Sequence, residues 1–419
     1  MVSLKASVRE IVNQISSIDE RTYSRHFAEA TSARAGASAF DGLTSHSLAI
    51  ASARVNSKAR RSVNLVLPEL SPNVIFAGIR TAIDMSVDLA RSLDVDLRLI
   101  YFQKRMKVRE FRTLQEYLDR EFAYRIKIVH VGELATSISS TADTWIATHW
   151  TTAHSLDVAA RLGVVEKSRC IYLVQDYEPG FMPWSTEFAL AQATYHAGFT
   201  LIVNSSPVAK YLREHESLDV APERVFRPKL DIERLERAAS IRLGNSSTPR
   251  IAFYARPNKP RNMFKLGITT LHRVADMLGE SSSVEIVSMG ASHRAPSGAL
   301  PRGMRVLGQL DWSSYFGELA RTDVMLSLQM SPHPSHPPLD AVVAGGHSVT
   351  NELEGVRGGL HPNLHAVEAE PDALAEAVVG ALSHSRSAEA EHRFAPEVLA
   401  TLGEPMEAVV ATVSKMFKD

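Results

Sequence analysis

The chain has 419 residues, of which 45% are apolar, so it is longer than one hydrophobic core usually supports and two domains are expected. Its 46 basic and 47 acidic side chains nearly cancel, and no long block of like charge stands out, which excludes a dedicated nucleic-acid binder. The single cysteine, Cys170, excludes an intramolecular disulfide framework and a multi-cysteine zinc site, and it fits a reducing compartment.

The N-terminal segment MVSLKASVREIVNQISSIDE contains charges and no apolar block long enough for a signal peptide. No segment approaches the roughly 20 apolar residues that a membrane span requires. We therefore expect a cytoplasmic protein, with the inner face of the membrane as the alternative location. Residues 1–60 are interpreted as a helical extension that packs on its own fold, and packing on a partner or on a membrane surface stays open.

Six short β-rich segments alternate with helical patterns beyond residue 60, which is typical of a parallel sheet flanked by helices. They are VNLVLP (63–68), DLRLIYF (96–102), RIKIVHV (125–131), TWIATHW (144–150), RCIYLVQD (169–176) and FTLIVN (199–204). We assign residues 61–235 to a Rossmann-like acceptor domain. The segment 236–249 lacks a core run and ends in a Gly, Asn, Ser and Pro cluster, which predicts a linker.

A second alternating series follows the predicted linker. Its strands are RIAFYA (250–255), SVEIVSM (283–289), MRVLG (304–308), DVMLSL (323–328) and HSVTN (347–351), with helices expected near 262–279, 312–321 and 338–345. Residues 250–395 then form a second Rossmann-like domain, and residues 396–419 a helix that packs back on the first. The predicted fold is α/β, with two doubly wound domains that face each other across a cleft where ligands bind.

A cationic turn ends the first strand of the second series, in IAFYARPNKPRNMF. It holds Arg256, Lys259 and Arg261 just before a helix, where guanidinium groups can bind phosphate oxygens bidentately. The two prolines of the turn restrict its conformation and reduce the entropy lost on ordering. We predict a diphosphate site in which Arg256 carries more of the ligand's charge than Lys259. A solvated basic turn is the alternative.

Four segments carry a resemblance to a known family: FAGIRTAIDMSVDLA, YLVQDYEPGFMPWSTEFALA, FYARPNKPRN and SPHPSHPPLDAVVAGG. Between about residues 60 and 400 the chain resembles the WsaF-like GT-B rhamnosyltransferases of S-layer-glycan and rhamnan synthesis, within the glycosyltransferase family 4 grouping. The resemblance implies a GT-B fold and transfer of L-rhamnose from dTDP-β-L-rhamnose to a saccharide or glycolipid acceptor, without metal ion or cofactor. Peripheral membrane association and a homodimer stay open.

Three other functions remain as alternatives. The first is a GT-B transferase that uses another nucleotide sugar, and the second is a sugar-nucleotide epimerase of the same architecture. The third is a non-catalytic relative that binds nucleotide or glycan. Release of dTDP from dTDP-rhamnose separates the leading hypothesis from the first two.

Further donor-binding residues are expected in both domains. In FAGIRTA, Gly78 begins a helix with free N–H groups, and Arg80 and Thr81 add donors, although a plain β–α turn with a surface arginine fits as well. Gln309 and Leu310 stand where GT-B enzymes bind the nucleobase. The family commonly has a lysine in place of Gln309, so one phosphate or base contact becomes neutral here.

The segment from Ser331 to Asp340 resembles the place where family 4 enzymes carry two glutamates. The second falls on Asp340, which we predict to accept a hydrogen bond from the deoxyribose 3′-hydroxyl, and the first falls on Pro332. An ordinary first-turn helix acid is the alternative for Asp340. Two histidines without a third ligand do not predict a metal site, so a donor-sugar pocket is expected instead. The two histidines are His333 and His336, and Ser331 and Pro338 are further candidate residues for substrate binding.

Catalysis by inversion of a β-linked donor requires a general base on the acceptor side. Asp176, at the end of RCIYLVQD, is the first choice, Glu178 the second and His149 the third. Either carboxylate is alternatively a hydrogen-bond acceptor that fixes the loop. Three aromatic side chains offer faces for stacking of a sugar ring, namely Tyr177, Phe181 and Trp184. For Trp184 a role in the core fits equally well.

Overall fold

The computed structural model describes residues 42–418 except 73–74, 76, 244–247, 294–299 and 388–391. Most of the helical extension predicted for residues 1–60 lies outside this range. The chain forms two compact units, and each is built from separate stretches of sequence. The first comprises the described parts of Met1–Leu173, Trp184–Leu201 and Val410–Asp419, and the second comprises those of Val174–Pro183 and Ile202–Val409. The units therefore differ from the contiguous domains that were predicted.

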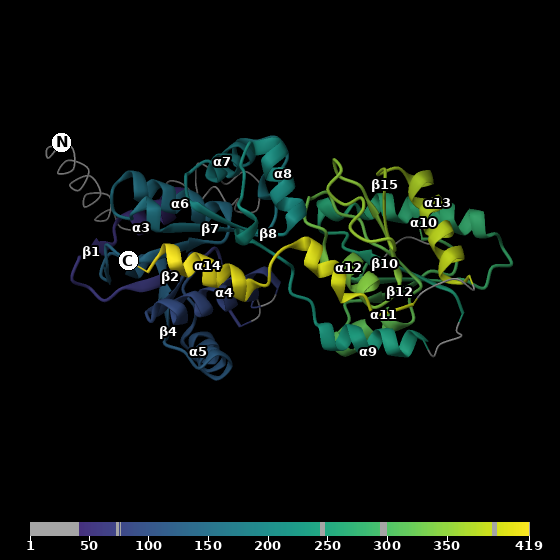
Figure 1. Ribbon diagram of the computed structural model, residues 1–419, viewed down its shortest axis with the longest axis horizontal. Coiled ribbons are helices and arrows are strands. Elements are labelled where there is room, and N and C mark those ends of the chain that lie inside the picture. The colour runs from purple at the N-terminus through teal and green to yellow at the C-terminus, as the bar shows by residue number, and fades with distance from the viewer. Residues whose placement is uncertain are drawn as a thin grey trace. The chain divides into compact units, whose positions relative to one another are not determined.

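A seven-stranded sheet has the order β4-β3-β2-β6-β7-β8-β9. Its strands β4, β3, β2, β6 and all but the last residue of β7 lie in the first unit, whereas most of β8 and all of β9 belong to the second. The strands are β2 (Ser62–Leu67), β3 (Asp96–Tyr101), β4 (Ile126–His130), β6 (Thr144–Ala147), β7 (Cys170–Val174), β8 (Thr200–Asn204) and β9 (Val225–Phe226). The helices are α3 (Leu43–Ala51), α4 (Ala77–Leu93), α5 (Val108–Phe122), α6 (Trp150–Arg161), α7 (Thr186–Tyr195) and α14 (Met406–Met416). Figure 1 shows α3 and α6 on one side of this sheet and α4 and α5 on the other.

The apolar pattern of these segments explains why they form a doubly wound sheet. All six residues of β2, SVNLVL, are buried, as expected for a parallel strand that is covered on both faces. In α5 the buried residues Leu114, Leu118 and Phe122 recur every four positions, so one stripe of the helix faces the core.

A six-stranded sheet organises the second unit, in the order β12-β11-β10-β13-β14-β15. Its strands are β10 (Arg250–Ala255), β11 (Glu285–Gly290), β12 (Arg305–Gly308), β13 (Val324–Leu326), β14 (His347–Asn351) and β15 (Leu364–Val367), paired in parallel. Its helices are α8 (Ser206–Glu216), α9 (Ile232–Leu243), α10 (Phe264–Leu278), α11 (Trp312–Ala320), α12 (His336–Val343) and α13 (Pro371–Ser385). This strand order is the Rossmann order.

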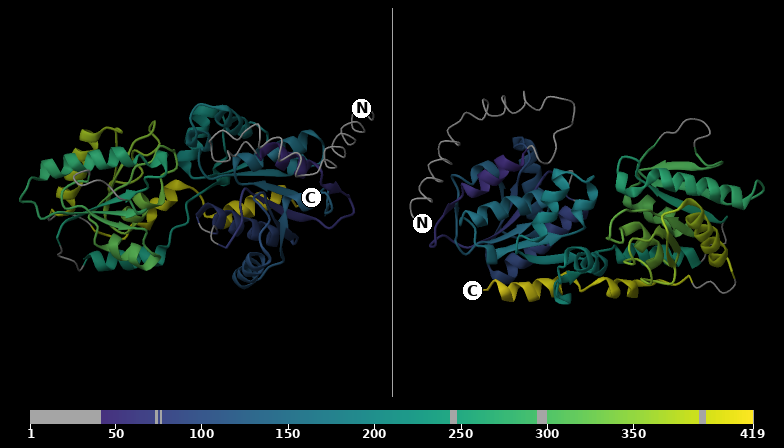
Figure 2. Two further views of the ribbon diagram at one scale, coloured as in Figure 1. Left: turned by 180° about the vertical axis from the view of Figure 1, so that it is seen from behind. Right: turned by 90° about the horizontal axis from the view of Figure 1, so that it is seen from above.

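Two separate cores cover the faces of the second sheet. Ile251 and Phe253 of β10 pack with residues of α10 and α13, whereas Ala252 packs with residues of α9, α11 and α12. The alternation follows from the period of two in a strand. Figures 1 and 2 show α10 and α13 on one side of this sheet and α9 and α11 on the other. The strand order reverses between β10 and β13, and ligands of such sheets bind at the carboxyl ends of the strands beside this reversal.

Two sequence predictions of secondary structure are wrong. The predicted linker over 236–249 is mostly helix α9, whose Leu235 and Ala238 lie in the core. The predicted helix near the C-terminus is divided into a 3₁₀ helix and α14. They separate at Gly403, which has φ 136° and where a Cβ would lie 2.8 Å from the carbonyl oxygen of Val225. Only glycine fits this conformation and this close approach.

The remaining elements are short. Strands β1 (Arg54–Val55) and β5 (Ile138–Ser139) pair in parallel. The 3₁₀ helices are η1 (Val131–Glu133), η2 (Lys167–Arg169), η3 (Glu178–Phe181), η4 (Pro222–Arg224), η5 (Pro260–Asn262) and η6 (Pro396–Leu402).

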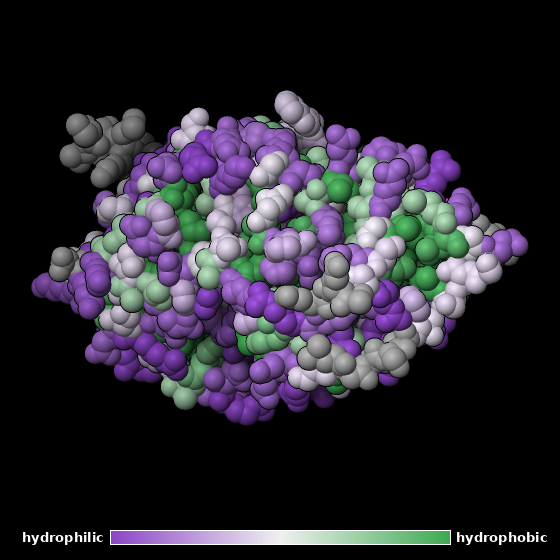
Figure 3. Space-filling view, turned by 45° about the vertical axis from the view of Figure 1, so that its right-hand side comes forward, coloured by the Kyte–Doolittle hydropathy of each residue, from purple (hydrophilic) through white to green (hydrophobic). Residues whose placement is uncertain are grey.

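On the face of the molecule in Figure 3, apolar residues form small areas between polar ones. In the described part of the chain, no helix combines the length and apolar character needed to cross a bilayer.

Candidate active site

The candidate site lies in the second unit, at the carboxyl ends of β10 and β13. The chain leaves β10 toward α10 and leaves β13 toward α12, and these helices cover opposite faces of the sheet. Both helices begin at a strained residue, Met263 with φ 45° and Ser335 with φ 67°. Such conformations cost on the order of 1–3 kcal/mol each and concentrate at functional sites, so both turns indicate a site at this edge.

The cationic turn after β10 keeps its charges available. Within the described residues, Arg256, Lys259 and Arg261 form no ion pair; Lys259 is exposed and the two arginines are half-buried. The Arg261 guanidinium lies 4.0 Å from the ring centre of Phe181, and its buried Nε has no hydrogen-bond partner. Burial lowers the pKa of Arg261, and the nearby Asp176 opposes that shift. An anionic ligand would supply the missing acceptor.

Asp176 comes to the same place from a distant part of the sequence. It follows β7, is half-buried, and accepts hydrogen bonds from the Ser331 hydroxyl and from the backbone N–H of Tyr177 at 2.8 Å. Burial raises the pKa of Asp176, while these hydrogen bonds and the charge of Arg261 oppose the rise. The structure thus brings together three residues predicted from sequence, Asp176, Arg261 and Ser331.

Tyr177 and Glu178 occupy different environments beside Asp176. Tyr177 is buried, and its hydroxyl donates to Glu216 at 2.6 Å while its ring contacts that of Tyr211. Burial and then the hydrogen bond to Glu216 raise the pKa of Tyr177. Tyr177 therefore packs toward α8 and does not present a face to a sugar. Glu178 begins η3 and is half-buried.

Asp340 lies in α12 and is buried. Its carboxylate accepts a hydrogen bond from the Tyr315 hydroxyl of α11 at 2.8 Å. Burial raises the pKa of Asp340 to about 7; the hydrogen bond from Tyr315 lowers it, and the charge of Asp231 adds to the rise. Asp340 is therefore close to half-protonated at neutral pH, which permits it to accept or donate a hydrogen bond.

His333 and Pro338 are buried in the turn and helix that follow β13. The Nδ1 of His333 accepts the backbone N–H of Ser335 at 3.0 Å, which holds the strained turn. Burial, and then the charges of Arg357 and Arg261, lower the pKa of His333 to about 4. His333 is thus neutral at physiological pH.

The remaining predicted residues are placed elsewhere. Gly78, Arg80 and Thr81 lie in the first turns of α4 in the first unit. Arg80 donates to Asp84 at 2.7 Å and to Glu121 at 2.9 Å. Burial lowers the pKa of Arg80, but the hydrogen bonds with Glu121 and Asp84 outweigh burial and raise it. These contacts favour a structural role for Arg80.

His149 and the pair Gln309–Leu310 also lie outside the cluster around Asp176. His149 caps α6 in the first unit, where its side chain accepts the N–H of Thr151 at 3.3 Å. Gln309 is exposed after β12, and Leu310 packs against the core of the second unit.

Arg357 was not among the predicted site residues; it is 1% exposed and donates to the carbonyl oxygens of Gln329, Ser331 and Asn351. It lies in a loop between glycines, so no sequence signal distinguishes it from a surface arginine. Tyr315, the partner of Asp340, was also not predicted, because its spacing within α11 indicates only a core residue.

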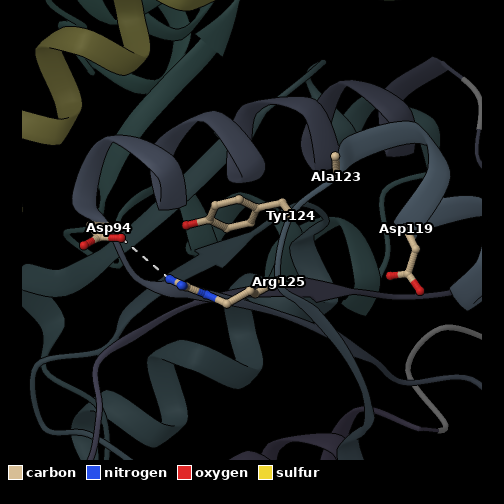
Figure 4. Close-up of a pocket in the computed structure, with 5 residues that line it drawn as sticks. All are labelled: Asp94, Asp119, Ala123, Tyr124 and Arg125. Atoms are coloured by element: carbon tan, nitrogen blue, oxygen red, sulfur yellow. Dashed lines mark ion pairs between the residues drawn. The ribbon is translucent and has the colours of Figure 1, made fainter.

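A hollow of about 460 Å³ occurs in the first unit (Figure 4) and is lined by Asp94, Asp119, Ala123, Tyr124 and Arg125. Arg125 approaches Asp94 at 3.6 Å. Asp94 and Arg125 precede β3 and β4, so the hollow lies at the amino ends of these strands. Ligands of open α/β sheets bind at the carboxyl ends, so we do not include it in the candidate site.

The two Rossmann-type sheets give the chain a fold of the GT-B class. A sucrose-phosphate synthase from Thermosynechococcus elongatus shares the fold with TM-score 0.55 and 12% identity, over 86% of this chain and 98% of that one. A UDP-forming α,α-trehalose-phosphate synthase from Burkholderia xenovorans in complex with glucose-6-phosphate shares it with TM-score 0.52 and 11% identity, over 86% of this chain and 100% of that one. The chain belongs to the WsaF family: residues 62–205 match the WsaF N-terminal domain and residues 249–379 the WsaF C-terminal domain.

One curated relative is similar in sequence. The O-antigen biosynthesis protein RfbC of Myxococcus xanthus is 30% identical over 229 residues, which cover 55% of this chain and 17% of that protein. The chain thus spans less than one fifth of the length of this relative.

Proposed function

We propose that the protein transfers L-rhamnose from dTDP-β-L-rhamnose to an acceptor hydroxyl of a saccharide in surface polysaccharide biosynthesis. The observation that carries the proposal is the cationic turn with Arg256 and Arg261 at the strand-order reversal, beside the half-buried carboxylate of Asp176. Membership of the WsaF family supports a glycosyl donor, and the name of the Myxococcus relative supports polysaccharide as the product. The donor identity follows from the family resemblance.

The donor's diphosphate binds at the cationic turn. Arg256 and Arg261 carry fixed charges that do not depend on cellular pH, and their unpaired state leaves their N–H groups ready for phosphate oxygens. As the glycosidic bond to the diphosphate breaks, negative charge grows on the leaving oxygen, and preorganised cations stabilise it without reorganisation. We therefore propose transfer without a divalent metal. Asp340 is the proposed partner of the deoxyribose hydroxyl.

Asp176 acts as the general base. The acceptor oxygen bonds to the anomeric carbon while the bond from that carbon to the diphosphate breaks, and the hydroxyl proton passes to the Asp176 carboxylate. Burial strengthens the carboxylate as a base, while Ser331 and Arg261 keep it ionised. Attack opposite the leaving group inverts the anomeric configuration. Glu178, and then His149, remain the second and third candidates for this role.

Calorimetry with dTDP, UDP and GDP tests the donor site. We expect dTDP to bind most tightly, and R256Q and R261Q each to weaken its binding about 10- to 100-fold, because each removes a charge-assisted contact of roughly 1.5–3 kcal/mol. The matched control is R273Q on α10, since Arg273 is exposed and paired with Asp372 at 3.1 Å. Unchanged dTDP affinity in both R256Q and R261Q would contradict the proposal.

Turnover of dTDP-β-L-rhamnose with a saccharide acceptor tests the chemistry. D176N is expected to lower kcat about 10²- to 10⁴-fold while dTDP affinity stays within about twofold. Equal turnover of wild type, D176N and E178Q would favour a base elsewhere. Transfer from a UDP- or GDP-sugar alone would support another donor. Loss of activity in EDTA that Mn²⁺ restores would reject the metal-independent mechanism.

A further inference from the structure

A buried arginine, Arg357, lies behind the candidate base. Its guanidinium donates to the carbonyl oxygens of Asn351 at 2.5 Å, of Gln329 at 2.6 Å and of Ser331. Its Nε has no hydrogen-bond partner. Burial lowers the pKa of Arg357 to about 10, and the negative charges of Asp176 and Glu352 oppose this shift, so the group is charged at neutral pH. Apolar side chains of similar volume often give equal or greater stability than buried charged groups. Stability alone therefore does not explain why an arginine stands at this position.

The loop that carries Arg357 is fixed by contacts that do not involve the guanidinium. The Glu352 carboxylate accepts the backbone N–H groups of Leu353, Arg357 and Gly358, at 2.8, 3.0 and 2.6 Å. Lys210 of α8 donates to the carbonyl oxygen of Gly355 at 2.7 Å. The loop therefore presents the Arg357 side chain from a rigid support.

The segment that receives the guanidinium leads directly to the candidate base. Asn351 accepts the N–H of Gln329 at 2.8 Å and donates to its carbonyl oxygen at 3.1 Å, so one end of the segment is fixed. Arg357 fixes the carbonyl groups of Gln329 and Ser331. The Ser331 hydroxyl then donates to Asp176.

The same segment also contacts the cationic turn. The N–H of Met330 donates to the carbonyl oxygen of Arg261 at 2.6 Å. Three residues of backbone thus connect Arg357 to the base and to the turn that is proposed to bind the donor.

We propose that Arg357 is a positioning residue for the transfer reaction, which fixes Ser331 against Asp176 and supplies a buried positive charge that keeps this carboxylate ionised. The inference rests on the role proposed for Asp176. Arg357 touches neither substrate, and it acts through the segment from Gln329 to Ser331.

The chain offers a matched control in Arg242 of α9. Arg242 is 6% exposed and donates to three backbone carbonyl oxygens, those of Ala344 at 3.0 Å, Leu319 at 2.8 Å and Thr322. Burial lowers its pKa to about 10 as well. These carbonyl groups precede β13 and β14, at the ends of the strands opposite to Asp176. Arg242 therefore reproduces the burial and bonding of Arg357 without a connection to the base.

Two measurements follow the protonation of Asp176 in wild type, R357M, R357K, S331A, R242M and R242K. One is the ¹³C titration of the Asp176 carboxyl group, assigned with D176N, and the other is the pH profile of kcat. We expect R357M and S331A to raise the titration midpoint and the acidic limb of the profile by about one pH unit, since each removes an interaction that favours the carboxylate.

R357K separates charge from geometry. A lysine keeps the charge but holds fewer carbonyl groups, so the midpoint is expected to return toward the wild-type value while kcat stays about tenfold lower. The Arg242 variants are expected to lower thermal stability and leave the midpoint unchanged. If R357M does not fold, the test rests on R357K, and wild-type kcat in R357K would then overturn the inference.

A midpoint in R357M and S331A that coincides with wild type would overturn the inference. An equal shift in R242M would also overturn it, because general loosening of the unit would then explain the effect. The carboxyl titration does not require turnover. Absence of transfer from every nucleotide sugar would therefore contradict the proposed function alone, whereas transfer with an unmoved midpoint would contradict only the role of Arg357.

Discussion

At the scale of single residues, Asp340 shows how burial changes the chemistry of a carboxyl group. Its pKa is raised to about 7, well above the ordinary value for aspartate, because α12 buries it against Tyr315. Between about pH 4 and pH 7 the folded state retains a proton that the unfolded state has released. Stability therefore falls as pH rises through this window and is level above it.

We expect D340N to remove this pH dependence, because an amide stays neutral throughout. At pH 8 the variant should be more stable than wild type by roughly 1–3 kcal/mol, and at pH 4 the two should differ little. Urea denaturation at both pH values measures the difference. E236Q, on the exposed side of α9, serves as the control. The same difference between D340N and wild type at both pH values would contradict the assignment.

Trp184 is the residue for which the structure decides between two interpretations. It is 92% exposed, so the core role is wrong. Its ring stacks on Phe188 with centroids 5.3 Å apart and planes 9° apart, which leaves the other face of the indole open. An exposed aromatic face can pack against the apolar face of a sugar ring. We retain Trp184 as a proposed contact to the acceptor saccharide.

W184A is expected to raise KM for the acceptor about tenfold and to leave dTDP affinity unchanged, whereas W184F should retain most of the affinity. Trp312 gives a matched control, because it is 63% exposed and stacks on Phe316 with centroids 5.8 Å apart. Initial rates at varied acceptor concentration provide the measurement. If W312A and W184A raise KM equally, Trp184 has no special role.

The sequence predicts the chemical type of the site residues better than their partners. Residue type and position after a strand are enough to select Arg261, Asp176 and Ser331. The bond from Ser331 to Asp176 joins residues 155 positions apart, and only the folded chain defines it. The neutralisation of Arg80 by Glu121 depends in the same way on packing between helices.

At the scale of elements, four histidines gather where β14, β15 and α13 meet. His347 is buried, and its Nδ1 lies 3.1 Å from the Nε2 of His365. Burial, followed by the proximity of His365, His384, His392 and Arg242, lowers the pKa of His347 to about 4. In the described residues, no group of three or more potential ligands is arranged to hold a metal ion. With this lowered pKa, His347 stays neutral at physiological pH.

The lowered pKa of His347 predicts that the second unit is less stable in acid. The unfolded chain binds protons at histidine below about pH 6.5, while folded His347 resists protonation down to about pH 4, so stability is lost as pH falls through this window. H347N stays neutral and should lose less stability than wild type between pH 7 and pH 5. Thermal melting at these pH values measures the effect. A parallel loss of stability in both proteins would contradict it.

At β10 the apolar run of a strand buried on both faces gives the correct bounds, since the strand begins and ends at the predicted residues. The bounds predicted for β14 are also correct, although Val349 is its one apolar residue. Strand β15 was not predicted, since three of its four residues are only half-buried and its apolar run is short. The linker prediction for 236–249 rests on the lack of a core run and on the Gly, Asn, Ser and Pro cluster at its end, and it misses helix α9. The spacing of Leu235 and Ala238, which both lie in the core, was the signal for the helix.

At the scale of the whole molecule, the donor should stabilise one unit more than the other. The proposed diphosphate and deoxyribose contacts come from residues 250–263 and 327–340 of the second unit. A ligand that binds only the folded state slows the opening reactions that expose its contacts. Hydrogen exchange with saturating dTDP should therefore show the largest protection in these two segments. Strongest protection at residues 77–81 would instead place the donor site at Gly78 and Thr81.

The first unit includes residues from far along the chain. Arg61 donates to the carbonyl oxygens of Phe417 and Lys418, across more than 350 positions, and Phe417 is 2% exposed. During translation, the early strands of this unit leave the ribosome long before their last packing partner exists. The first unit thus completes its packing around Phe417 only after the intervening residues have been synthesised, and the apolar surface that Phe417 covers is exposed until then.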